Sequence, residues 1–352
     1  MQTALHQRLG DNARIGVYNG AETALGFAGL EQELRALLSS AGVFDLGWRT
    51  KITATGKDRV RWLNGMITNN IRDLAADHGN YSFVLTHQGR IAGDLYAYNR
   101  GNHNDLLLDT DRSQAETLIK TLGRYIIMDD VKLADISESL TSIGLCGPKA
   151  KDVLAAVGID ASQLQPLQIA KQSVDGTEIT LVRGPEQKPN WHEIWVHPDN
   201  AQKIWDAVTR AGAQPVGTDA LELWRVLHGI PQYGQDIRER DLAQETEQQQ
   251  ALCFTKGCYI GQEIVERIRS RGQVHRKFTG FEFEDGLVAP GKYDVDDRTL
   301  AEITTAVSVP LPEGQRNIGL GYIRREAESA GRIDLSGKKA RVADLPFTIS
   351  SL

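Results

Sequence analysis

The stretch FTKGCYIGQEIVER, residues 254–267, places a cysteine between two glycines directly before a charged segment. Gly257 and Gly261 bracket Cys258 where a sharp turn is expected, and the residues that follow favour a helix. In that helix the glutamates come early and the arginines late, as the helix dipole prefers. Cys258 is therefore expected just before a helix N-terminus and near Lys256, a setting that stabilises a thiolate. A small buried cysteine in a tight turn is an equally good interpretation.

Asp94 is a second candidate for chemistry. It lies in the run YSFVLTHQGRIAGDLYAY, whose alternation around HQGR predicts a β-hairpin over 81–98. A carboxylate on such a strand could serve as a general base. It could also be a solvent-face residue that alternates with Gly93 and Leu95. The histidines show no metal-ligand spacing with Cys258, so the sequence predicts no bound metal.

The composition is that of an ordinary globular protein. With 352 residues, 41% hydrophobic and 24% charged, the chain is long enough for two or three domains with cores of their own. A net charge of −6 argues against wholesale nucleic-acid binding, which depends on phosphate neutralisation. No apolar run approaches the roughly 20 residues that span a bilayer, and no secretory signal is present, so we expect a cytoplasmic location. Three cysteines without a CxxC pattern indicate neither disulfides nor a four-thiolate site.

Strand and helix signals alternate through the first two thirds of the chain. Apolar residues recur at helical spacing over 30–41, and Gly42 follows where that helix would end. After the hairpin, LLLD at 106–109 predicts a third strand, so the sheet is at least partly antiparallel.

Further helices are predicted by their start signals. DRSQAETLIKTLG opens with a capping-box pattern, Asp111 and Gln114, and a strand around 131–134 should follow that helix. Downstream, EIWVH predicts a strand, and Pro198 suits the start of the helix after it. Two related α+β units are the resulting expectation, although the repeat is weak.

The last part of the chain differs in kind. From about Phe278 onward, short β-prone runs alternate with Gly, Pro and Asp clusters, which predicts a small β-barrel or jelly-roll domain. The preceding stretch DIRERDLAQETEQQQAL, residues 236–252, is polar and poor in β-branched residues. It is therefore expected to be an exposed connector leading into the cysteine motif.

The cysteine motif also carries a family resemblance. KGCYIGQEIVERIRSRGQVHRKFTGF resembles the signature of the YgfZ family, folate-binding relatives of the glycine-cleavage T-protein (aminomethyltransferase) that act in making or maintaining iron-sulfur enzymes. Other stretches resemble the wider T-protein superfamily in the expected order, among them GVFDLGWRTKITATGKDRVRWLNGMITNNI, LTHQGRIAGDLYAY and LWRVLHGIPQYGQDI, so the resemblance covers nearly the whole chain. The family's KGCY-x-GQE-x-x-x-R element is matched at Lys256, Gly257, Cys258, Tyr259, Gly261, Gln262, Glu263 and Arg267.

This resemblance implies an α+β, T-protein-like fold with two ferredoxin-like domains and a C-terminal β-barrel around a central hole that holds a folate. A bilobed folate-binding portion is expected in 1–275, with two interleaved subdomains of which 51–140 is one unit, and the barrel in 276–352. The implied cofactor is tetrahydrofolate. Cys258 and Asp94 are the implied catalytic residues, and the implied folate contacts are Arg225, Tyr233, Lys256, Gln262, Glu263 and Arg267.

Departures from the T-protein pattern bear on the activity. T-proteins commonly carry two adjacent aspartates after the first hairpin, whereas this chain has Gly93 and Asp94. Leu227 stands where the R-x-E-x-G element of T-proteins supplies a pterin-binding glutamate. Because a missing partner costs about 1 to 3 kcal/mol per unsatisfied group, folate recognition must be weaker or use other contacts. T-proteins also lack the cysteine motif.

Two hypotheses follow from the residues and the resemblance. The first is an accessory protein that binds tetrahydrofolate and uses Cys258 in iron-sulfur cluster assembly or repair, with iron-sulfur client or assembly proteins as partners. The alternative is a folate-dependent one-carbon transferase of the aminomethyltransferase type, in which Asp94 steers a proton. A binding module with an inert cysteine is a third option.

Other partners are expected to be few. The basic run RIRSRGQVHRK, 267–277, could hold a polyglutamate tail, a phosphate or RNA, but a solvated helix end is the commoner explanation and RNA contact is not expected. A monomer is the default, and no membrane partner is expected.

Overall fold

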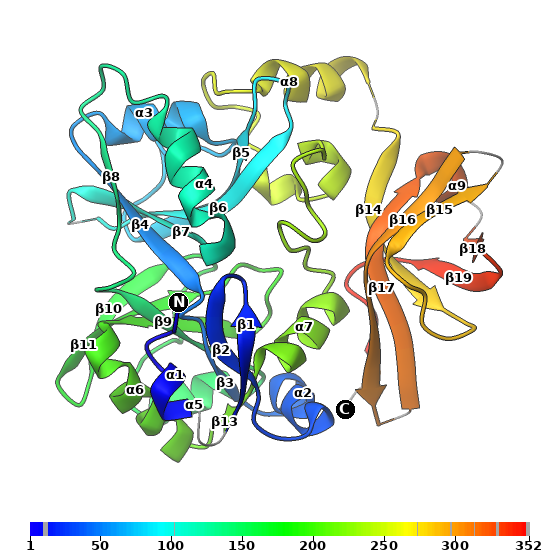
Figure 1. The fold of residues 1–352 in the computed structure, drawn as a ribbon. Helices are drawn as coiled ribbons and strands as arrows, with labels where there is room; N and C mark the ends of the chain where they lie inside the picture. Colours follow the sequence, from blue (N-terminus) through cyan, green and yellow to red (C-terminus); the bar gives the residue numbers. More distant parts are fainter. Residues whose placement is uncertain are drawn as a thin grey trace. The chain divides into compact units, whose positions relative to one another are not determined.

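The computed structural model describes residues 1–9, 13–101, 103–272, 274–295, 298–312, 314–328 and 331–349 (Figure 1). The chain divides into two compact units. Unit 1 comprises Met1–Ser82 and Asp94–Leu221, and unit 2 comprises Phe83–Gly93 and Glu222–Leu352. The tip of one hairpin in the first half of the chain thus belongs with the C-terminal half. The boundary expected after residue 275 and the separate unit expected over 51–140 stay predictions.

Unit 1 contains a six-stranded sheet. It is antiparallel except that β13 runs parallel to β3. Helices α1, α5 and α6 cover it with a buried apolar core that includes Leu154, Ile204 and Trp205. In spatial order its strands are β10 (Ile169–Val174), β11 (Thr177–Arg183), β12 (Trp191–Val196), β9 (Thr141–Cys146), β3 (Gly42–Asp45) and β13 (Gln214–Pro215), and the helices of this region are α1 (His6–Leu9), α2 (Leu30–Ser39), α5 (Ala150–Ala156) and α6 (Pro198–Arg210).

A second, five-stranded sheet contributes to unit 1. It is joined to the first sheet by a buried cluster that includes Tyr98, Val182 and Trp195. A short hairpin of β1 (Arg14–Tyr18) and β2 (Ala21–Gly26) precedes both sheets. The strands in spatial order are β5 (His78–Leu85), β6 (Ile91–Asn99), β7 (Asp105–Asp111), β4 (Arg49–Thr55) and β8 (Lys132–Asp135), and the accompanying helices are α3 (Arg59–Met66) and α4 (Arg112–Gly123).

Most of the periodic patterns form the elements they predict. The helix expected over 30–41 is α2, and the hairpin expected over 81–98 is β5 with β6. The strands expected at 106–109 and 131–134 are β7 and β8, and α6 begins at Pro198 as predicted. Leu30 is the exception on the α2 stripe, since 40% of it is exposed.

The predicted capping box is wrong. Asp111 does precede α4 in an extended conformation, but its side chain makes no capping hydrogen bond to that helix. Its carboxylate instead accepts from Arg49 and Asn19. Gln114, the other half of the expected box, bonds to Asp94. Both side chains therefore bond to residues distant in the sequence instead of to the first turn of α4.

Unit 2 is built on an antiparallel sheet of six strands, which Figure 1 shows as a curled sheet. The closed barrel is not confirmed, because β15 and β18 lie at opposite ends of the strand order and do not pair within the described residues. Two ferredoxin-like domains are likewise not confirmed. In spatial order the strands are β15 (Gly291–Val295), β16 (Arg298–Leu311), β17 (Gly314–Arg324), β14 (Arg276–Phe283), β19 (Lys338–Ala343) and β18 (Arg332–Leu335), and α9 (Arg325–Glu328) follows β17.

The segment between α7 (Thr218–Leu227) and α8 (Gln262–Arg271) is not the exposed connector that its polarity suggested. It holds two short 3₁₀ helices, η1 (Ala243–Thr246) and η2 (Gln249–Ala251). Asp236 and Asp241 within it are fully buried. Asp236, Asp241 and Glu245 are buried carboxylates held in ion pairs or hydrogen bonds, whereas Glu239 and Glu247 are exposed.

Within the described ranges, every helix is too short or too polar to cross a bilayer.

Candidate functional site

Asp94 is held in a defined orientation by two side chains of unit 1. Tyr81 Oη donates to Asp94 Oδ2 at 2.6 Å, and Gln114 Nε2 donates to Asp94 Oδ1 at 2.7 Å. The Asp94 N–H returns a bond to Gln114 Oε1 at 3.1 Å. Asp94 is half-buried on β6, with fully buried neighbours on either side. Asp94 alternates with the buried Gly93 and Leu95, as the solvent-face interpretation expects, but its carboxylate is also fixed by hydrogen bonds from two side chains.

Two cationic side chains on β4 form ion pairs with two carboxylates on the neighbouring strand β7. Arg49 lies opposite Asp111 in the strand register and Lys51 opposite Asp109. Arg49 Nη1 donates to Asp111 Oδ1 at 2.6 Å, and its Nε donates to Asp109 at 3.1 Å. Lys51 is fully buried and donates to Asp109 Oδ1 at 2.7 Å. We call these four residues together with Tyr81, Asp94, Tyr96, Gln114, Lys188 and Glu193 the Asp94 cluster.

The two carboxylates on β7 differ in their acidity. Burial raises the pKa of Asp109, but the charges of Arg49 and Lys51 outweigh it and lower the pKa below its usual value. For Asp111, burial dominates, and the nearby charge of Asp94 adds to it against the opposing charge of Arg49. Together these effects raise the pKa of Asp111 to about 6. Asp111 can therefore gain or lose a proton near neutral pH, which suits acid–base work.

Aromatic rings and one more lysine complete the Asp94 cluster. The rings of Tyr81 and Tyr96 lie 5.0 Å apart, and Lys188 Nζ lies 5.7 Å from the Tyr96 ring centre. Glu193 accepts from the indole N–H groups of Trp191 and Trp195, on either side of it along β12. The cluster holds four carboxylates against three cations, so a ligand with a positive charge or N–H donors is favoured there.

Sequence reasoning identified Asp94 but missed the residues around it. A usable signal existed in RTKITAT and LLLDTD, each of which carries two like charges two positions apart. Opposite charges that face each other across antiparallel strands stabilise the pair, so those two patterns could have been matched. The contact of Gln114 with Asp94 could not be predicted, because it depends on how α4 packs on the sheet. Tyr81 lies on β5, so the predicted hairpin already places it on the strand next to Asp94.

The cysteine loop, residues 252–261, leads into α8 in unit 2. As predicted, the helix begins at Gln262, directly after Gly261. Gly261 has φ of +81°, and a Cβ there would lie 2.6 Å from the Thr86 carbonyl oxygen. Only glycine fits such a position, which fixes the loop against the β5–β6 hairpin tip. Cys258 is exposed, so the buried-cysteine interpretation is wrong.

The predicted ligand residues of the cysteine motif differ in exposure. Lys256 is buried, with its Nζ 5.0 Å from the centre of the Tyr259 ring. Gln262 is half-buried, and Glu263 and Arg267 are exposed on α8. Their role in folate binding stays a prediction.

Arg225, an implied folate contact, is buried on α7. Its guanidinium donates to both oxygens of Glu222 at 2.6 Å and to Asp236 Oδ2 at 2.7 Å. It also bonds to the Ile230 carbonyl and to Thr305. These contacts tie α7 to the following loop and to β16. Tyr233, in that loop, is half-buried, and ligand contact by either residue stays a prediction.

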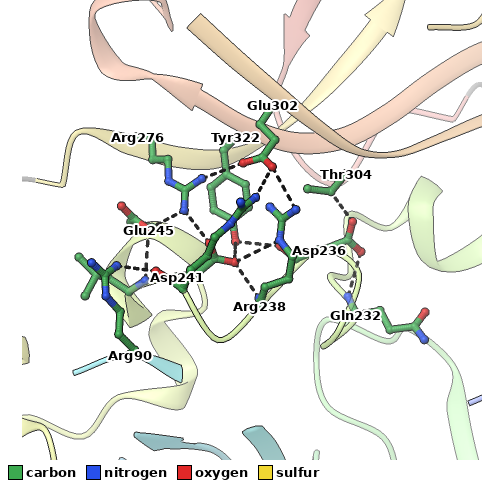
Figure 2. A network of polar contacts seen from close by, with 12 residues as sticks. Arg90, Gln232, Asp236, Arg238, Asp241, Glu245, Arg276, Glu302, Thr304 and Tyr322 are labelled. Atoms are coloured by element: carbon green, nitrogen blue, oxygen red, sulfur yellow. Dashed lines mark hydrogen bonds and ion pairs between the residues drawn. The ribbon is translucent and has the colours of Figure 1, made fainter. Parts of the chain in front are cut away.

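Figure 2 shows the network of ion pairs that holds the segment 236–252, which the sequence predicts to be an exposed connector. Arg276 donates to Asp241 at 2.6 Å, to Glu245 at 3.0 Å and to Glu302 at 3.0 Å. Arg238 also pairs with Glu302 at 3.0 Å. The network fastens the segment before the cysteine loop onto β14 and β16.

The basic run after the motif is largely used inside unit 2. Arg276 belongs to the ion-pair network, Lys277 pairs with Glu328, and Arg269 lies 4.5 Å from the ring of Phe254. In the described part of the chain, no three His, Cys, Asp or Glu side chains gather in a way that could hold a metal ion.

Comparison with known proteins supports the T-protein part of the resemblance. The chain is 28% identical over 347 residues to an aminomethyltransferase of Rubrobacter xylanophilus, covering 97% of this chain and 92% of the relative. It is 26% identical over 348 residues to an aminomethyltransferase of Geobacillus kaustophilus, covering 94% and 93%. Both relatives are named aminomethyltransferases, so the narrower assignment of this chain to the YgfZ family is not confirmed.

A solved structure and a family model complete the comparison. The fold matches the crystal structure of glycine cleavage system aminomethyltransferase T from Bartonella henselae with a TM-score of 0.87 and 19% identity, over 99% of this chain and 98% of the other. The T-protein-like fold is thereby confirmed. The model of the GCVT N-terminal domain matches residues 5–256, and this chain belongs to that family.

Proposed function

We propose that this chain binds tetrahydrofolate at the Asp94 cluster and catalyses folate-dependent one-carbon transfer of the aminomethyltransferase type. The observation that carries the proposal is the hydrogen-bonded carboxylate of Asp94 next to Asp111, whose pKa is raised to about 6. The names of the relatives support the same reaction class.

The residues of the cluster fit the cofactor. A pterin is a flat heteroaromatic ring with N–H donors, and the cluster offers two tyrosine rings together with carboxylate acceptors. The surplus carboxylate also suits a substrate that carries an amine, because a nearby negative charge favours the protonated form. Tetrahydrofolate would supply the nitrogen that accepts the one-carbon group.

Each residue then has a distinct role. Tyr81 and Gln114 hold the Asp94 carboxylate, so that it can accept a proton or an N–H bond at a fixed position. Arg49 holds Asp111, which takes up or releases a proton near neutral pH. Lys51 neutralises Asp109, so that Asp109 stays ionised and supports the arrangement without titrating.

The test is turnover of an aminomethyl donor with tetrahydrofolate, measured as ammonia release, together with calorimetric binding of tetrahydrofolate. Asp94→Asn should abolish turnover, and it should weaken binding about tenfold or more, because a charged hydrogen bond is worth roughly 1.5 to 3 kcal/mol. Asp160→Asn, which changes an exposed carboxylate, is the matched control and should leave both unchanged. Full turnover by Asp94→Asn would refute the proposal.

A second function is favoured by a different observation. Cys258 is exposed in a loop whose geometry depends on Gly261, within the motif that resembles the YgfZ family. This supports a tetrahydrofolate-binding accessory protein that acts on iron-sulfur enzymes through Cys258, with iron-sulfur client or assembly proteins as partners. If Cys258→Ala fails to restore iron-sulfur enzyme activity in cells lacking the protein, while folate binding and aminomethyl turnover persist, this function holds. Full restoration by Cys258→Ala would exclude it.

A further inference from the structure

A second cysteine, Cys253, lies in the cysteine loop and has not entered either function. It is half-buried, five residues before Cys258 and two residues after the end of η2. Its Sγ lies 3.5 Å from Thr255 Oγ1. The adjacent Phe254 ring packs under the guanidinium of Arg269, at 4.5 Å, which anchors this part of the loop to α8. Cys253 is thus held in the loop and only partly covered.

The surroundings of Cys253 stabilise its thiolate. Burial alone would raise the pKa of Cys253, but hydrogen bonds from the Thr255 hydroxyl, from the backbone of Thr255 and from the backbone of Lys256 outweigh it. The charge of Lys256 acts in the same direction, and the net effect lowers the pKa of Cys253. Since the thiolate is the nucleophilic form, this sulfur is primed to react.

Tyr259, six residues after Cys253 in the cysteine loop, carries a buried polar atom. Its side chain is only 7% exposed, and its Oη is buried without a hydrogen-bond partner among the described residues. Burial, then the charges of Glu266 and Cys253, raise the pKa of Tyr259 to about 12, so the phenol keeps its proton as a donor. A buried donor without an acceptor is costly, and an oxygen atom attached to the Cys253 sulfur would supply one.

We propose that Cys253 is a peroxide-reactive thiol, with hydrogen peroxide or a small organic hydroperoxide as its substrate. The thiolate sulfur attacks one peroxide oxygen, the S–O bond forms and the O–O bond breaks. The sulfur is oxidised to a sulfenic acid and the peroxide is reduced, and the departing hydroxide or alkoxide takes a proton from solvent to leave as water or alcohol. The sulfenic oxygen accepts from Thr255 and Tyr259. This inference stands independently of the proposed functions.

The experiment treats the intact protein with a small excess of hydrogen peroxide in the presence of dimedone, which traps sulfenic acids, and maps the adducts by mass spectrometry. Because this measurement uses the wild-type chain, its outcome does not depend on whether a variant folds. We expect the adduct at Cys253 before any at Cys258, and none at the buried Cys146. An adduct that forms first at Cys258, or no adduct at Cys253, would overturn the proposal.

Two variants test the role of the surroundings. Tyr259→Phe removes only the phenol oxygen, and it should slow trapping at Cys253 several-fold. Cys258→Ser should leave the rate at Cys253 within about twofold, because Cys258 takes no part in the step. Unchanged trapping in Tyr259→Phe would contradict the assigned role of the phenol. Circular dichroism confirms that each variant is folded, and iodoacetamide labelling of Cys253 across pH should show a midpoint below about 8.5, the value of a free thiol.

Discussion

His192 makes the six-stranded sheet of unit 1 sensitive to acid. It is fully buried on β12, between Trp191 and Glu193 of the site region. Burial, then the charges of Arg183 and Lys151, lower the pKa of His192 to about 4, which the backbone of Asn190 only partly offsets. In the unfolded chain the same imidazole titrates near its ordinary value of 6.5.

The sign and size of the effect follow from that difference. Between pH 6.5 and pH 4 the unfolded chain binds a proton at this residue and the folded chain does not. Unfolding is therefore favoured as the pH falls through this window, and nothing is lost above it. At pH 5 the loss amounts to about 2 kcal/mol in the free energy of unfolding relative to pH 7.5, at roughly 1.4 kcal/mol per pH unit.

The assay is urea denaturation at pH 7.5 and pH 5, followed by tryptophan fluorescence. Five of the six tryptophans belong to unit 1, so the signal reports on the unit that contains His192. His192→Leu should lose about 2 kcal/mol less than the wild type between the two pH values. His275→Leu, at an exposed histidine, should lose as much as the wild type. Equal losses in wild type and His192→Leu would refute the reasoning.

Two further substitutions test how unit 2 is held together. Gly261→Ala forces a side chain into left-handed backbone and against Thr86, and it should lower the free energy of unfolding in urea by at least about 1 to 2 kcal/mol. Gly257→Ala meets no atom within 4 Å and is its control, so equal effects would contradict the assigned role of Gly261. Arg225→Met leaves Asp236 without its ion-pair partner and should cost about 3 to 5 kcal/mol in the same assay. Arg14→Met, at an exposed ion pair, should stay within about 1 kcal/mol, and a similarly small loss for Arg225→Met would show that the network contributes little.

Elements with a repeating pattern could be predicted from the sequence, and elements defined by distant partners could not. The stripe of α6 and the alternation of β6 are local, so α6 and the 81–98 hairpin formed where expected. Closure of the C-terminal sheet depends on whether β15 meets β18, and no local pattern encodes that contact. The partial burial of the segment 236–252 cannot be predicted for a similar reason. Its buried Asp241 and Glu245 are paired with Arg276, which lies outside the segment.

In the candidate site, too, residues with a local pattern could be predicted and contacts between distant residues could not. Asp94 and the cysteine motif stand out by residue type and spacing, and they could be named from the sequence. The raised pKa of Asp111 could not, because it results from burial and from the charge of Asp94, a residue on another strand. The setting of Cys253 could not be predicted either, because its stabilising contacts come from a bend in the loop.

The failed capping box strengthens the assignment of the Asp94 cluster. Asp111 and Gln114 are placed to cap α4, and a capping bond is typically worth about 1 kcal/mol. The structure forgoes that bond and directs Asp111 to Arg49 and Gln114 to Asp94. Sequences usually follow local rules, and departures concentrate at sites where function imposes another arrangement. If the cluster were only structural, Gln114→Leu would alter stability alone. If it positions Asp94 for catalysis, Gln114→Leu should lower the rate of aminomethyl transfer at saturating tetrahydrofolate even where the protein remains fully folded.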